Sequence, residues 1–147
     1  MRNIFITDSQ SARFMEKESG HCKGKPGDQF DFHGTNVVCA ELRALTVSNA
    51  KLQSLQPLAL KFRNTAYLTA SFNRIVDLTP VLYLSQLVTL DVSHNKIESL
   101  APLSELHRLT TLRCQHNLVS ALAPLARLSK LKELFISHNK VRESASP

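Results

Sequence analysis

The chain has 147 residues, 43% of them hydrophobic and 20% charged, with a formal net charge of +6. This composition excludes a wholly disordered charged chain, and the absence of any run of about 18 apolar residues excludes a membrane-spanning helix. The basic excess lies after residue 41, because residues 1–41 carry five Lys or Arg and six Asp or Glu, whereas residues 42–147 carry thirteen and six. Such an excess favours acidic partners but does not determine a fold.

Residues 1–41 are predicted to form a polar segment that is partly disordered or acts as a degenerate cap. The apolar stretch Ile4-Phe5-Ile6 is shorter than the roughly 7–15 residues of a secretion signal, so we expect no such signal. Residues 8–28 are polar and glycine-containing, which predicts a loosely folded stretch. Phe30-Asp31-Phe32 alternates like a strand and is a candidate for a degenerate first strand. Both a cap and an interaction tail fit this segment.

The three cysteines, Cys22, Cys39 and Cys114, are odd in number and contain no CxxC spacing. This pattern predicts neither a disulfide framework nor a cysteine zinc site, and it favours a reducing compartment. We expect Cys114, which stands where other repeats have a branched apolar residue, to be a small buried hydrophobe.

Residues 42–141 repeat with a period of 22. Pro80, Pro102 and Pro124 keep this step, and Pro57 is one residue out of phase. Apolar and polar residues alternate before each repeated asparagine, as at Leu90 and Val92 in the third copy, which is the period of a half-buried strand. The repeated asparagines are Asn73, Asn95, Asn117 and Asn139.

Each repeat predicts one short strand of a parallel sheet and one return connection. The apolar residues from Ile97 to Leu109 recur at every third place, which favours a 3₁₀ or extended return over an α-helix, and proline can begin it. An asparagine amide can bond both N–H and C=O groups of the backbone, so stacked asparagines predict a buried ladder. The first two copies are less regular, since Ala50, Thr65 and Ala70 replace the expected residue types.

The pattern L-x-x-L-x-L-x-x-N-x-L resembles the leucine-rich repeat over residues 42–141, about two-thirds of the chain. The spacing is similar to the 22-residue subclass, which includes a regulatory subunit of type-1 protein phosphatase, a light chain of axonemal dynein and the A-prime protein of a spliceosomal particle. The resemblance implies an α/β-type solenoid, a short curved horseshoe with about five parallel strands on its concave face and 3₁₀ or extended returns on its convex face. Residues 142–147 form a tail without a recognisable cap, which predicts either a truncated longer protein or a capping partner.

The strand positions that do not face the core form the candidate partner-binding site. Five strands about 4.8 Å apart span roughly 20 Å, which can supply about the 800 Å² of one side of a standard interface. Tyr67, Arg113 and Phe135 are of the residue types that often dominate binding energy, although single exposed aromatic residues are also normal. The candidate residues are Tyr67, Thr69, Thr89, Asp91, Thr111, Arg113, Glu133 and Phe135.

Two further rows accompany the asparagines. His94, His116 and His138 each precede one, but a linear array of imidazoles does not converge on one metal ion, and Phe72 holds the same place. We therefore expect no metal site and a solvent-facing row. The other row is a possible basic edge that could follow phosphates, although no aromatic residue is interleaved along it for base stacking. It contains Lys51, Arg74, Lys96 and Lys140.

Sequence motifs of catalysis are absent: there is no GxSxG, GxxxxGK[ST], HExxH or glycine-rich dinucleotide turn, and all four glycines precede residue 35. We expect no enzyme, cofactor, membrane contact or small-molecule substrate. The prediction is a non-catalytic protein-interaction module, a cytoplasmic scaffold or targeting subunit, with association with the cytoskeleton or cilium implied by the resemblance and the nucleus left open. Implied partners are a phosphatase, a motor component or a ribonucleoprotein subunit. The alternative is a ribonucleoprotein component that contacts RNA through the basic edge.

Overall fold

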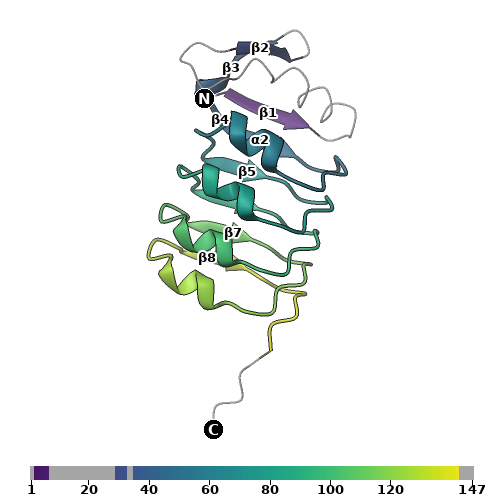
Figure 1. The fold of residues 1–147 in the computed structure, drawn as a ribbon, viewed down its shortest axis with the longest axis vertical. Coiled ribbons are helices and arrows are strands. Elements are labelled where there is room, and N and C mark those ends of the chain that lie inside the picture. The colour runs from purple at the N-terminus through teal and green to yellow at the C-terminus, as the bar shows by residue number, and fades with distance from the viewer. Residues whose placement is uncertain (1, 7–28, 33–34, 143–147) are drawn as a thin grey trace.

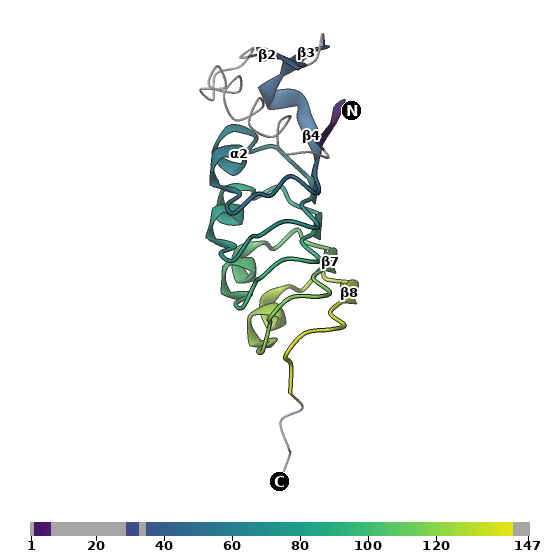
Figure 2. The ribbon, with the colours of Figure 1, turned by 90° about the vertical axis from the view of Figure 1, so that its right-hand side faces the viewer.

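A computed structural model describes residues 2–6, 29–32 and 35–142. Its main sheet has six parallel strands in the order β1-β4-β5-β6-β7-β8. The strands lie along one side of a stacked coil and short helices along the other (Figures 1 and 2). This arrangement confirms the predicted curved solenoid of leucine-rich-repeat type. The strands are β1 (Arg2–Ile6), β4 (Leu42–Val47), β5 (Tyr67–Thr69), β6 (Thr89–Asp91), β7 (Thr111–Arg113) and β8 (Glu133–Phe135).

The returns begin at the repeated prolines and form short helices. Three of them are 3₁₀ helices, as predicted, and the first is an α-helix, so the prediction is wrong for that repeat. The additional residue in this repeat explains the difference: Ala59 N–H donates to the Leu55 carbonyl four residues back, whereas Val81 N–H donates to the Leu78 carbonyl three residues back. The returns are α2 (Gln56–Lys61), η3 (Thr79–Tyr83), η4 (Ala101–Glu105) and η5 (Ala123–Arg127), and η2 (Cys39–Glu41) precedes β4.

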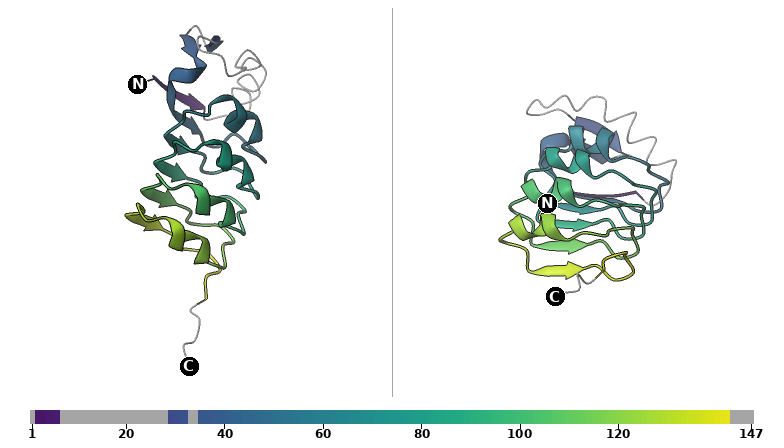
Figure 3. Two further views of the ribbon diagram at one scale, coloured as in Figure 1. Left: turned by 60° about the vertical axis from the view of Figure 1, so that its left-hand side comes forward. Right: turned by 60° about the horizontal axis from the view of Figure 1, so that its bottom comes forward.

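The core fills the space between the sheet and the returns. One leucine from each inner strand lies in register and is at most 2% exposed: Leu45, Leu68, Leu90 and Leu112. Leu134 holds the same position in β8 but is 39% exposed, because β8 has a neighbouring strand on one side only in the described part of the chain. The apolar layer is therefore closed in the middle of the coil and open at β8. Figure 3 shows the strands of the sheet stacked in order, with β8 at the yellow end of the stack.

The N-terminal segment differs from the prediction. β2 (Gln29–Phe32) pairs antiparallel with β3 (Thr35–Val38) in a separate two-stranded sheet, so Phe30-Asp31-Phe32 is not a first strand of the solenoid. That place belongs to β1, which pairs parallel with β4. The physical reason is that a parallel pairing needs a connection of a dozen or more residues, which the chain between Phe32 and Leu42 does not provide. Residues 8–28, predicted to be loosely folded, lie outside the described residues.

The state of one cysteine also differs from the prediction. Cys39 is buried and disulfide-bonded, so the prediction that the chain has no disulfide is wrong for this residue. An odd number of cysteines does not prevent a single bridge. Because disulfides persist mainly in oxidising compartments, the cysteine pattern no longer supports a reducing one, and the cytoplasmic location stays a prediction. In the described ranges, no helix has the length and apolar character needed to cross a bilayer.

Candidate functional site

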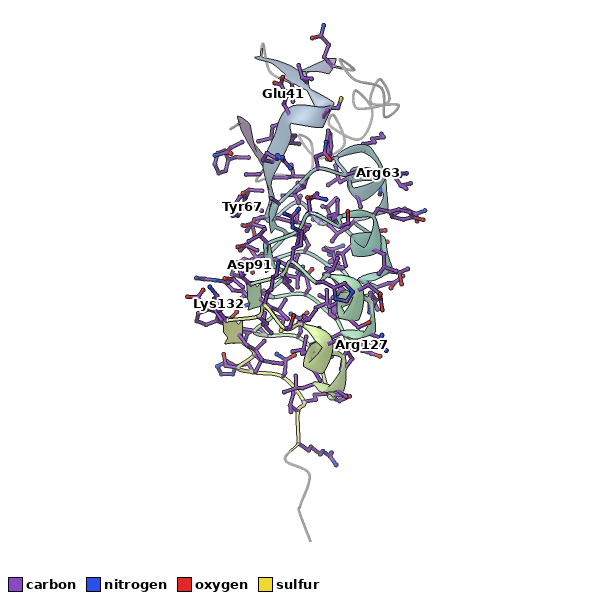
Figure 4. All side chains as sticks on the ribbon, turned by 90° about the vertical axis from the view of Figure 1, so that its left-hand side faces the viewer. Glu41, Arg63, Tyr67, Asp91, Arg127 and Lys132 are labelled. Atoms are coloured by element: carbon purple, nitrogen blue, oxygen red, sulfur yellow. The ribbon has the colours of Figure 1, made fainter. Side chains whose placement is uncertain are left out.

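The strand register arranges the outward side chains of the sheet in two rows, which we call the concave face. Tyr67, Thr89, Thr111 and Glu133 are successive partners in one row, and Thr69, Asp91, Arg113 and Phe135 in the other. All eight residues predicted as partner-binding therefore lie together, on the opposite side of the sheet from the buried leucines. Figure 4 shows Tyr67 and Asp91 on the strand side of the coil, and Arg63 and Arg127 on the helix side.

Three aromatic and charged side chains of the concave face, those of Asp91, Arg113 and Phe135, contact a neighbouring residue. Tyr67 is 41% exposed and Phe135 is 39% exposed. The Arg113 guanidinium lies over the Phe135 ring, 4.7 Å from its centroid. Asp91 Oδ1 accepts hydrogen bonds from the N–H and the hydroxyl of Ser93, at 3.0 and 2.7 Å. Side chains fixed in this way lose less conformational freedom when a partner binds.

Sequence reasoning missed the contribution of β1. Phe5 pairs with Thr46, which pairs with Thr69, so the second row continues across β4 to β1. Phe5 is 66% exposed, while its neighbour Ile4 is buried against the core. Six strands about 4.8 Å apart make this row roughly 24 Å long, with an aromatic ring at each end. The sequence feature that indicates this strand is the run Ile4-Phe5-Ile6, whose residue types are common in β-strands.

The asparagine ladder joins each repeat to the one before it. Asn95 Oδ1 accepts a hydrogen bond from Ile75 N–H at 2.9 Å. Its Nδ2 donates to the Ala70 carbonyl of the preceding repeat at 3.0 Å and to the Val92 carbonyl of its own repeat at 3.0 Å. The same bonds recur at the other ladder positions, so the ladder satisfies buried backbone groups at the strand ends.

The histidine row forms a continuous stack, which we call the ring column: Phe72, His94, His116 and His138. Successive ring centroids lie 4.1, 4.2 and 4.1 Å apart, with interplanar angles of 10–15°. Neighbouring rings cover one another's faces, so the inner rings, His94 and His116, have no open face on which a nucleotide base could stack. Within the described residues, no group of three or more His, Cys, Asp or Glu side chains is placed to hold a metal ion.

The four residues of the predicted basic edge, Lys51, Arg74, Lys96 and Lys140, are all exposed. A shallow groove lies along part of this edge, lined by Gln53, Arg74, Val76 and Lys96. Half-buried Leu118 interrupts the row. The first three residues of the basic edge, Lys51, Arg74 and Lys96, are thus accessible to an acidic ligand. Leu118 separates them from the fourth, Lys140.

Two other groups have shifted pKa values for structural reasons. Burial, with a smaller contribution from the charge of Asp91, raises the pKa of the Cys114 thiol to about 11, so this cysteine is protonated and unreactive near neutral pH. Hydrogen bonds from the hydroxyl and the N–H of Thr79 lower the pKa of the Asp77 carboxyl.

The parallel sheet, the short returns and the asparagine ladder define a leucine-rich-repeat solenoid. Residues 86–107 match the family model described as Leucine Rich Repeat. Such folds suggest a protein-interaction module and are generally non-catalytic. A sequence search of curated proteins finds no match.

Solved structures of bacterial internalins are similar to this chain. Internalin C2 from Listeria monocytogenes aligns with a TM-score of 0.66 and 25% identity over 72% of this chain and 56% of that chain. Internalin InlF from the same organism aligns with a TM-score of 0.61 and 29% identity over 71% of this chain and 37% of that chain. This chain therefore spans about half, or less, of the length of these neighbours.

Proposed function

We propose that the chain is a non-catalytic protein-interaction module that binds a protein partner through the concave face. The observation that carries the proposal is the second row of this face, which has Phe5 and Phe135 at its ends and Arg113 packed on Phe135. Aromatic and arginine side chains held in place at an exposed surface are the residues that most often dominate binding energy.

The dimensions of the concave face support a folded partner over a small molecule. A surface roughly 24 Å long across the strands is of the size of one side of a standard protein interface. Both aromatic ends stand on this face rather than in a cavity, so a ligand must be broad enough to reach them together. A protein surface meets this requirement, and a metabolite does not.

The proposal includes the role of a scaffold or targeting subunit inside the cell. The 22-residue spacing supports this role through its resemblance to regulatory and assembly subunits. On that basis, the partner class is a phosphatase, a cytoskeletal or ciliary motor component, or a ribonucleoprotein subunit.

Affinity capture with matched variants tests the concave face. The concave variant replaces Tyr67, Asp91, Arg113 and Phe135 with alanine. The control variant replaces four exposed residues of the helix side, two apolar or aromatic and two charged, with alanine: Leu82, Tyr83, Glu105 and Arg127. We expect proteins captured by the parent and by the control to be absent with the concave variant, after circular dichroism has shown that all three are folded. Equal capture by the parent and the concave variant would refute the proposed site.

The alternative is RNA binding at the basic edge, and the exposed groove beside Arg74 and Lys96 favours it. Its test measures the affinity for a single-stranded RNA at 50–200 mM salt. If all four cations contact phosphates, changing Lys51, Arg74, Lys96 and Lys140 to glutamine should make the slope of log K against log salt shallower by about 3. RNA binding that is unchanged by these substitutions would refute the alternative. Protein capture that is unchanged by nuclease would also refute it and leave protein binding as the remaining proposal.

A further inference from the structure

The ring column places three imidazoles in direct contact. His94 and His116 lie 4.2 Å apart and His116 and His138 lie 4.1 Å apart, nearly parallel in both cases. All three residues have φ angles of 54–56°, the left-handed region that few residues other than glycine occupy. Phe72, at the other end of the column, has φ 56° and covers one face of His94. The column is therefore a regular built feature of four successive turns.

The backbone of these turns joins neighbouring repeats. His94 N–H donates to the Gln115 carbonyl at 2.9 Å, and His116 N–H donates to the Ser137 carbonyl at 3.0 Å. His94 and His116 therefore contribute both a stacked ring and a backbone hydrogen bond to the next repeat. A force that separates the rings consequently acts on the bonds that hold the turns of β6, β7 and β8 together.

Protonation supplies such a force. Imidazole gains its charge near pH 6.5, and two unit charges 4 Å apart in water shift a protonation equilibrium roughly fivefold. His116 lies between two other imidazoles. Its partial removal from water, followed by the charges of His138 and His94, lowers its pKa. The middle ring of the column therefore takes up a proton less readily than a free imidazole does.

The surroundings of the column do not compensate this charge. The charged residues of the same turns are the cations Arg74, Lys96 and Lys140, and β7 ends at a fourth cation, Arg113. Asp91 at the end of β6 is a nearby carboxylate, but its Oδ1 is bonded to Ser93. Among the described residues, no carboxylate forms an ion pair with a ring of the column.

We propose that the ring column is an acid-sensitive element, in which charging of the stacked imidazoles below neutral pH loosens the turns that join β6, β7 and β8. The sign follows from linkage. Because the folded state binds the proton on His116 more weakly than the unfolded chain does, its contribution to stability is complete above the ordinary histidine pKa of about 6.5 and is lost as the pH falls below it. The proposal does not depend on the identity of any partner.

The test compares the melting temperature of the parent and of a triple variant between pH 7.5 and pH 5.5, above the range in which ordinary carboxylates titrate. The triple variant, H94F/H116F/H138F, keeps the rings and removes the titration, and Phe72 shows that phenylalanine is accommodated in this turn. We expect the parent to lose a few degrees more than the variant over this range. His107, on the convex side, provides the control: H107F should retain the parent's loss in acid.

Two further measurements keep the test decisive if the triple variant does not fold. The pKa of His116, measured by NMR, should rise in H94F/H138F, because the neighbouring charges are removed while the rings remain. The His94 and His116 amides should lose protection from hydrogen exchange in the parent at pH 5.5 relative to pH 7.5, after correction for the intrinsic rate, and H116F should retain it. An unchanged His116 pKa, or equal acid sensitivity of the parent and the phenylalanine variants, would overturn the proposal.

Discussion

The Asn73 amide should contribute more to stability than any other amide of the asparagine ladder. Its Oδ1 accepts two buried N–H groups, those of Ala50 and Leu52, at 3.0 and 3.1 Å. Asn95 Oδ1 accepts a single buried one, from Ile75. A buried donor left without a partner costs about 1–3 kcal/mol, so Asn73→Ala should destabilise by about 4 kcal/mol and Asn95→Ala by about 2 kcal/mol.

The carbonyl side of the ladder hardly changes this difference. The Ala70 carbonyl accepts from the amides of both Asn73 and Asn95, so loss of either leaves it one partner. Asn139 is only half-buried, and its Oδ1 accepts from Val119 N–H in a part-buried setting. Water can replace part of that interaction, and Asn139→Ala should therefore cost less than about 1 kcal/mol.

Urea denaturation followed by far-UV circular dichroism measures these differences, with Ser120→Ala as an exposed control expected within about 0.5 kcal/mol of the parent. The m-value should stay constant across the series. If Asn139→Ala costs as much as Asn73→Ala, the number of buried donors does not determine the effect, and the account of the ladder is wrong. A lower m-value in Asn73→Ala would instead show that the first repeats unfold separately.

Three other outcomes follow from burial. Leu90→Ala should destabilise by about 2–5 kcal/mol, as for a fully buried leucine, and Leu134→Ala by less than half as much, because its side chain is 39% exposed; urea denaturation compares them. Cys114, with its pKa raised to about 11, should react with iodoacetamide at pH 8 at least a hundredfold more slowly than a free thiol, and labelling before unfolding would contradict its burial. Phe5→Ala should leave the melting temperature within a few degrees of the parent and reduce partner capture, whereas undiminished capture would remove β1 from the proposed site.

The regular repeats were predictable from the sequence because their determinants are local. The 22-residue phase of the asparagines and prolines places each strand a short connection away from the next. The strands from β5 to β8 follow this phase, and β4 is one residue out of step. The concave residues from Tyr67 to Phe135 then share a face, because side chains alternate along a strand. The contact of Arg113 with Phe135 was not predicted, since it depends on the conformations of both side chains rather than on register.

The missed features depend on distant or geometric causes. The pairing of β1 with β4 joins residues separated by more than thirty positions that contain no periodic pattern, so no local signal announces it. The α-helical form of the first return was not predicted, because the effect of one additional residue on the hydrogen bonds depends on backbone geometry. The first return has an α-helical bond from Ala59 N–H to the Leu55 carbonyl, where the next return has a 3₁₀ bond from Val81 N–H to the Leu78 carbonyl.

The two aromatic ends of the concave face lie on the two edge strands of the sheet. Among the residues that the structure describes, β1 pairs with β4 alone and β8 with β7 alone, and Leu134 of β8 is 39% exposed. Phe5 and Phe135 therefore project from the strands with the least support, whereas the residues between them stand on a closed core. A partner that contacts both rings must hold both edges in place, and part of its binding energy is used to order them. Binding should for this reason protect the amides of β1 and β8 from exchange more than those of β6, which are already protected by neighbours on both sides.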